Sequence, residues 1–190
     1  MAKEKRLSNF GLLSLVWRIT RKFRGVCYGP EFILAIVAWL LTSPYWLMQA
    51  WWDQVISTLP TILGLTVSGF AVFLGFGSDD FKRFLSKGKD PDDNSYMSVG
   101  AAFVFFVFVQ LLAVLFALVV KGFQFPTPDF LLDYKKIINF GNYVAGAIGY
   151  FLFIYSLALS LRASLRIFRL SRWYSRYLIK TDPDRKPVEK

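Results

Sequence analysis

The sequence has no histidine and only one cysteine, Cys27. Without histidine, the commonest acid–base residue and the commonest metal ligand are both missing. A single cysteine excludes a disulfide within the chain. The sequence also lacks a phosphate-binding glycine loop, a nucleophile elbow and any zinc-type spacing. We therefore expect a protein that is not an enzyme and that uses no cofactor and no metal.

The acidic residues are few, and all thirteen lie outside four long apolar runs. Ion-coupled transporters bury ionisable groups near the middle of the membrane, so that class is disfavoured. Asp79 and Asp80 could form a catalytic pair, but acidic residues after a Gly-Ser pair are typical of a helix start. Asp90 and Asp92 alternate as in a calcium loop, but Ser95 stands where that loop needs glycine, which favours a solvated turn.

Hydrophobic residues make up 55% of the chain and aromatic residues 18%, while the charged residues fall in blocks. A bilayer core needs about 20 apolar residues per helix. The chain has four uncharged runs of that length, and the sequence predicts an all-α polytopic membrane protein with four transmembrane helices. These runs are 33–52, 55–76, 98–120 and 137–161.

Basic residues are distributed unevenly around these runs. Twenty of the 23 lysines and arginines precede the first run, lie between the second and third, or follow the fourth. Cytoplasmic segments are enriched in lysine and arginine, so we expect a multi-pass protein of the cell inner membrane with both termini in the cytoplasm. The net charge of +10 mostly reflects this bias, and direct binding of nucleic acid is not needed to explain it.

Amphipathic cytoplasmic helices are expected at both ends of the membrane domain. Apolar residues of 12–23 share one side of a helical wheel and basic residues the other, which indicates a helix at the membrane surface. The fourth run should continue as a basic helix past its end. A shorter helix is expected in the loop after the second run, around Phe81. The predicted parts are a segment 1–31, a membrane domain 32–161 with a cytoplasmic loop 77–97, and a basic helix and tail 162–190.

Small residues recur at four-residue spacing in the second and fourth runs, a pattern that lets membrane helices approach closely. The spacing leaves open whether these faces join helices of one chain or of several copies, and a homo-oligomer is expected. The predicted packing residues are Gly64, Ser68, Ala71, Gly75, Gly141, Ala145 and Gly149. Lone amides in spans usually bond to a neighbouring helix, but in an oligomer they could line a pore. The candidate pore residues are Gln110, Asn139 and Asn142.

Basic residues also form a stripe after the fourth run, at intervals of three, four or seven. Such a surface can bind membrane lipid, an acidic cytosolic protein or a phosphate backbone, and we rank them in that order because no base-stacking module accompanies the stripe. For the first helix, adhesion to anionic lipid is the simpler expectation. The predicted residues for a partner or anionic lipid are Arg18, Arg21, Lys22, Arg162, Arg166, Arg169, Arg176 and Lys180.

One stretch, LGLTVSGFAVFLGFGSDDF at residues 63–81, resembles small four-span bacterial inner-membrane proteins of antiphage defence operons, such as the membrane subunit of the Kiwa system. The resemblance implies a membrane-resident sensor or effector that works with a cytosolic partner, and it assigns no functional residue. Two functions follow. The first is a non-enzymatic membrane sensor or scaffold that recruits a cytosolic protein through its basic face. The alternative is a homo-oligomeric pore or channel that depolarises the membrane.

Overall fold

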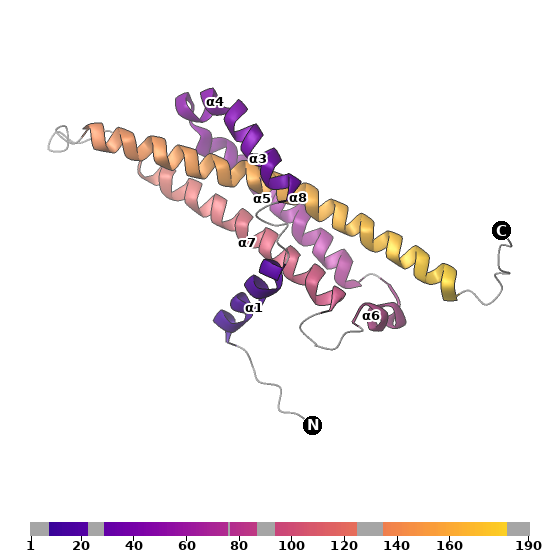
Figure 1. Cartoon of the computed structure of the whole chain (residues 1–190). Coiled ribbons are helices and arrows are strands. Elements are labelled where there is room, and N and C mark those ends of the chain that lie inside the picture. The colour runs from indigo at the N-terminus through magenta and orange to yellow at the C-terminus, as the bar shows by residue number, and fades with distance from the viewer. Residues whose placement is uncertain (1–7, 23–28, 76, 87–93, 125–134, 182–190) are drawn as a thin grey trace.

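A computed structural model describes residues 8–22, 29–75, 77–86, 94–124 and 135–181. Every regular element within these ranges is a helix, which confirms the expected all-α class. The helices are α1 (Asn9–Lys22), α3 (Pro30–Leu41), α4 (Ser43–Met48), α5 (Trp51–Gly75), α6 (Asp79–Leu85), α7 (Ser95–Gly122) and α8 (Lys135–Thr181). The longest three, α5, α7 and α8, pack along one another and form the body of the molecule (Figure 1).

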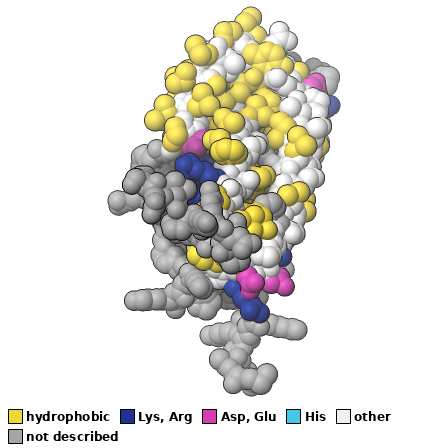
Figure 2. Space-filling model, turned by 90° about the vertical axis from the view of Figure 1, so that its right-hand side faces the viewer, with side chains coloured by type: hydrophobic (Ala, Val, Ile, Leu, Met, Phe, Trp, Pro, Cys, Tyr) yellow, Lys and Arg dark blue, Asp and Glu magenta, His cyan; other side chains and the backbone are white. Residues whose placement is uncertain are grey.

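Three helices are long and apolar enough to cross a bilayer: α5, α7 and the Lys135–Ile179 part of α8. Their outward surfaces carry large apolar side chains such as Leu65, Leu115 and Phe140, which are 68%, 58% and 69% exposed. Figure 2 shows hydrophobic side chains spread over the upper part of one face, with most of its described charged side chains lower down or at its margins. Helices that are apolar on their outer faces suit lipid rather than water. The chain therefore has the helices of a multi-pass membrane protein.

The predicted run 33–52 is not one continuous helix. It is divided between α3, α4 and the first residues of α5. The break falls at Thr42, whose hydroxyl donates to the Ala38 carbonyl at 2.7 Å, and Pro44 follows in the first turn of α4. Proline lacks the backbone N–H that a continuing helix needs. With 12 residues, α3 is about 18 Å long, well short of a bilayer core of about 30 Å. Four continuous spans are therefore not observed.

Two contacts define the ends of the bundle. Lys121 forms an ion pair of 2.8 Å with Asp53 where α5 begins and α7 ends, near α4, and we name this the α4 end. Phe73 packs on Tyr96 with 5.0 Å between ring centroids where α5 ends and α7 begins, near α6, and we name this the α6 end. The helices α5 and α7 are therefore antiparallel, and α8 runs from the α4 end to the α6 end (Figure 1).

Helix α3 starts partway along the bundle. Glu31, in its first turn, meets Arg162 of α8 at 3.4 Å, and the Trp39 indole donates to the Ala147 carbonyl at 3.0 Å. Arg162 lies two residues after Ser160, which bonds to Gln110 in the middle of α7. Consequently α3 covers only the half of α8 that lies toward the α4 end, and Glu31 sits near the middle of the molecule.

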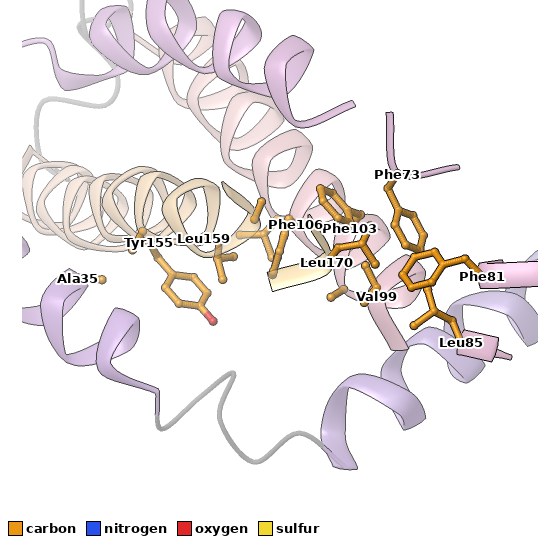
Figure 3. Close-up of a cluster of buried hydrophobic side chains, with 14 residues drawn as sticks. Ala35, Phe73, Phe81, Leu85, Val99, Phe103, Phe106, Tyr155, Leu159 and Leu170 are labelled. Atoms are coloured by element: carbon orange, nitrogen blue, oxygen red, sulfur yellow. The ribbon is translucent and has the colours of Figure 1, made fainter. Parts of the chain in front are cut away.

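The main core follows α8 past the predicted end of its membrane run at residue 161. Ala163 and Leu170 are each 4% exposed and belong to the same buried cluster as Phe103 and Phe106 of α7. Figure 3 shows this row of side chains reaching from Ala35 and Tyr155 to Phe81 and Leu85 of α6. The first turns after residue 161, predicted as the start of the basic cytoplasmic part of this helix, are thus packed against the bundle.

The two short flanking helices also pack on the long ones. In α1, Leu15 and Ile19 are buried in a small cluster with Ala101 of α7. The start of α6 has the predicted capping: Gly77 has a φ of 85°, and the Ser78 hydroxyl accepts from the Phe81 N–H at 3.4 Å. A glycine is favoured there because other residues rarely adopt a positive φ. Both α1 and α6 contact the half of α7 nearest the α6 end.

Candidate functional site

A polar cavity of about 390 Å³ lies between the first turn of α3, the start of α7 and the middle of α8. It occupies the half of the bundle toward the α6 end. Its walls combine one carboxylate, three guanidinium groups, two hydroxyls and an indole with two apolar side chains. The lining residues, with Asn94 at the α7 cap, are Glu31, Asn94, Ser95, Ser98, Val99, Arg162, Leu165, Arg166, Arg169 and Trp173.

The arginines reach this cavity because of their spacing on α8. Residues 162, 166, 169 and 173 follow one another at intervals of four, three and four, which places them on one helix face. Arg162 is paired with Glu31, and the two side chains are only 15% and 16% exposed. The Arg166 guanidinium lies over the ring of Phe106 at 5.9 Å from its centroid, a cation–π geometry. Two of the three arginines are therefore drawn into the bundle.

The amino-terminal end of α7 forms the opposite wall. Asn94 caps the helix, with its side-chain oxygen accepting from the Met97 N–H at 2.8 Å. Ser95 and Ser98 add hydroxyl groups to the same wall. The first turn of a helix carries a partial positive charge. The described lining holds three arginines and one glutamate, and Arg162 is paired with that glutamate.

The predicted basic stripe is therefore divided. Arg169 and Arg176 are exposed, as is Arg18 on α1, whereas Arg162 and Arg166 turn inward toward Glu31 and Phe106. The predicted residues Arg21, Lys22 and Lys180 have side chains outside the described part of the structure. A surface for a cytosolic partner would thus use the exposed arginines, whereas Arg162 and Arg166 line the cavity together with the exposed Arg169.

Gln110 is completely buried at the centre of the three long helices. Its amide donates to the hydroxyls of Thr66 on α5 and Ser160 on α8, at 3.1 and 2.8 Å. These hydroxyls in turn donate to carbonyls of their own helices. The Gln110 side-chain oxygen is buried and has no hydrogen-bond partner among the described residues. This arrangement ties the three helices together.

The predicted pore residues do not come together in one chain. Gln110 lies inside the bundle, while Asn139 and Asn142 are exposed on α8 toward the α4 end. The described residues around Gln110 are packed core, with Phe106 and Ala113 each 0% exposed. A conduit between copies of the chain could be lined by Asn139 and Asn142, but the buried Gln110 would not reach it in this packing.

The predicted small-residue faces of α5 and α8 do not pack against each other in the same way: one is exposed and the other is partly covered. The four on α5 (Gly64, Ser68, Ala71 and Gly75) are exposed, and a Cβ added at Gly64 or Gly75 would meet no atom within 4 Å. On α8, Gly141 is exposed and Ala145 is partly buried. Gly149 is buried beneath the ring of Trp51, which occupies the space of a Cβ. On α8, the Trp51 side chain of α5 therefore packs on Gly149. The small-residue face of α5 is exposed within one chain.

Sequence reasoning missed most of the cavity. In the sequence, Glu31 is one of thirteen acidic residues outside the membrane runs, and it lies 131 positions before Arg162. Nothing in one sequence connects two positions that far apart. The serines at the start of α7 resemble ordinary polar residues of a helix start. The spacing of Arg162, Arg166 and Arg169 does predict that they share one face of a helix. It does not predict whether that face points into the bundle or away from it.

With three helices long and apolar enough to cross a bilayer, the fold is compatible with a multi-pass helical membrane protein. In the part of the chain that the structure describes, no group of histidine, cysteine, aspartate or glutamate side chains could hold a metal ion. Comparison with protein-family models, curated proteins and solved structures gave no match.

Proposed function

We propose that the chain is a non-enzymatic sensor or scaffold of the cell inner membrane, which recruits a cytosolic protein through basic residues at the α6 end. The observation that carries the proposal is the continuity of α8. This single helix of 47 residues begins among exposed apolar side chains and reaches the exposed Arg172 and Arg176 without a break. The uneven charge of the sequence supports a cytoplasmic position for both termini.

The packing of α6 on α8 supports a route by which a change in the long helices could reach the basic surface. Phe81 lies against Tyr174 and Tyr177, with ring centroids 4.9 and 5.5 Å apart. A shift of α8 relative to α5 and α7 would therefore move α6 together with the basic surface. Such a shift changes function only if a stimulus favours one packing arrangement over another. The resemblance of residues 63–81 to defence-operon membrane subunits makes phage infection the stimulus to examine first.

The recruitment proposal is tested by reversing charge on the outward arginines. In the double variant Arg172→Glu/Arg176→Glu, we expect a co-purifying cytosolic protein to be lost while membrane insertion is retained. The matched control is Lys135→Glu/Lys136→Glu, which makes the same charge change at the other end of the same helix. Retention of the protein by the first variant, or equal loss from both, would contradict recruitment through this surface.

A homo-oligomeric pore is the second candidate function, and the uncovered α5 face favours it. Small residues on a lipid-facing helix let a second copy approach closely. Leucine at Gly64 and Ser68 should then lower the oligomer mass measured in detergent by light scattering. Expression of a pore should collapse the membrane potential, read with a voltage-sensitive dye, and substitution of the exposed Asn142 should relieve the collapse. A potential that stays unchanged on expression rules the pore out.

A further inference from the structure

The first helix, α1, has two apolar faces, and only one of them packs on the bundle. Leu15 and Ile19 are buried in a cluster with Ala101 of α7. Phe10, Leu13 and Trp17 follow one another at intervals of three and four and so form a second stripe on the helix. These three side chains are 86%, 47% and 56% exposed. Recruitment of a cytosolic protein through α8 does not account for this second stripe.

The direction of α1 indicates what surrounds it. The helix crosses α7 instead of running alongside it, and its amino-terminal half points away from the three long helices (Figure 1). A helix that crosses the spans of a membrane protein lies closer to the plane of the membrane than to its normal. Amphipathic helices at a membrane surface lie in that plane, with their apolar side chains among the acyl chains.

The level at which α1 meets α7 is a boundary between apolar and charged residues. Ala101 and Phe105 belong to the third apolar run, and the ring of Trp17 lies 6.3 Å from that of Phe105. One residue further along α7, Phe106 carries the guanidinium group of Arg166. Apolar rings and guanidinium groups at one level are typical of the layer in which acyl chains meet headgroups.

We propose that Phe10, Leu13 and Trp17 insert among the acyl chains of the cytoplasmic leaflet. Through Phe105, their stripe continues onto the outer face of α7, where Phe108 is 48% exposed. Burial of apolar surface drives the insertion, so it requires no anionic headgroup. In this respect it differs from the adhesion of basic side chains that the sequence suggests. The inference rests on the proposed location in the membrane and goes beyond recruitment of a protein.

The test compares two adjacent positions of α1 in the full-length chain, reconstituted in vesicles of phosphatidylcholine, which has no net charge. Leu13→Cys and Ser14→Cys, each in a Cys27→Ser background, carry a nitroxide spin label. Oxygen concentrates in lipid and a nickel chelate stays in water, so their collisions with the label report its surroundings. Both positions are exposed in the chain. We expect oxygen access to exceed nickel access severalfold at Leu13→Cys, and the reverse at Ser14→Cys.

Three further variants make the test specific. Leu15→Cys lies at a buried position of α1 and should be reached by neither reagent. Leu115→Cys is the lipid reference, because Leu115 is 58% exposed in the middle of an apolar run. Trp17→Cys lies on the same stripe as Leu13→Cys and gives the same reading if Leu13→Cys fails to fold.

Three results would overturn the proposal: equal nickel access at Leu13→Cys and Ser14→Cys, access of neither reagent at Leu13→Cys, or oxygen access there only after phosphatidylglycerol is added. The last result would show that headgroup charge holds α1. The Leu115→Cys reference separates this failure from failure of the proposed function. Oxygen access at Leu115→Cys leaves the membrane location standing, whereas nickel access there refutes that location as well.

Discussion

At the scale of single residues, the glycines of the two apolar runs have different environments despite their similar spacing. Gly149 lies beneath the Trp51 ring, while Gly64 and Gly75 face open space. The four-residue spacing predicts that neighbouring helices approach closely, and at Gly149 the space of a Cβ is taken by the Trp51 side chain. It could not predict that the contact would be with a tryptophan side chain, because spacing on one helix carries no information about its neighbour.

Replacing Gly149 with alanine should destabilise the fold. The added methyl group overlaps the Trp51 ring, and overpacking of this kind costs about 1–3 kcal/mol. Gly141→Ala is the matched control on the same helix, since its Cβ would meet nothing within 4 Å. Alanine favours a helix over glycine, so this control should be neutral or slightly stabilising. Thermal unfolding in detergent measures both. Equal unfolding temperatures for the two variants would show that Trp51 does not rest on Gly149.

At the scale of elements, apolarity and length predicted α5, α7 and the apolar part of α8, and the capping residues predicted the start of α6. The same criteria failed for the run 33–52. The run is apolar without interruption, so its hydropathy predicts one helix. In the structure α3 ends after 12 residues at Thr42, whose hydroxyl donates to the Ala38 carbonyl, and Pro44 follows. Pro60 lies inside α5 without ending it. A proline therefore accompanies a helix end at residue 44 and not at residue 60, and apolarity and length do not distinguish the two positions.

The docking of α6 on α8 gives a prediction at this scale. Phe81 is 1% exposed and packs on Tyr174, whereas Phe84 of the same helix is 50% exposed. Phe81→Ala should cost about 3–5 kcal/mol of local packing and increase hydrogen exchange across α6. Phe84→Ala should have a clearly smaller effect, because its ring is already half in solvent. If the two substitutions raise exchange in α6 equally, α6 is not anchored through Phe81.

At the scale of the whole molecule, the charge pattern predicts that both termini lie on the cytoplasmic side of the membrane. Helices α1 and α6 and the end of α8 all lie toward the α6 end, away from Gln49 and the Asp53–Lys121 pair (Figure 1). Sequence could not predict that Arg162 and Arg166 would pack inside, because the boundary at residue 161 was drawn from charge alone. The position of α8 relative to α7 is set by core packing, including Ala163 and Leu170.

The central claim is that lipid surrounds the long helices and that the α6 end faces the cytoplasm. The most direct test is labelling of single cysteines in intact cells with a membrane-impermeant maleimide, in a Cys27→Ser background. The account predicts labelling of Gln49→Cys from outside, and labelling of Ser8→Cys and Thr181→Cys only after the membrane is permeabilised. Labelling of Ser8→Cys and Thr181→Cys from opposite sides of the membrane, or recovery of the chain as a monodisperse protein without detergent, would contradict it.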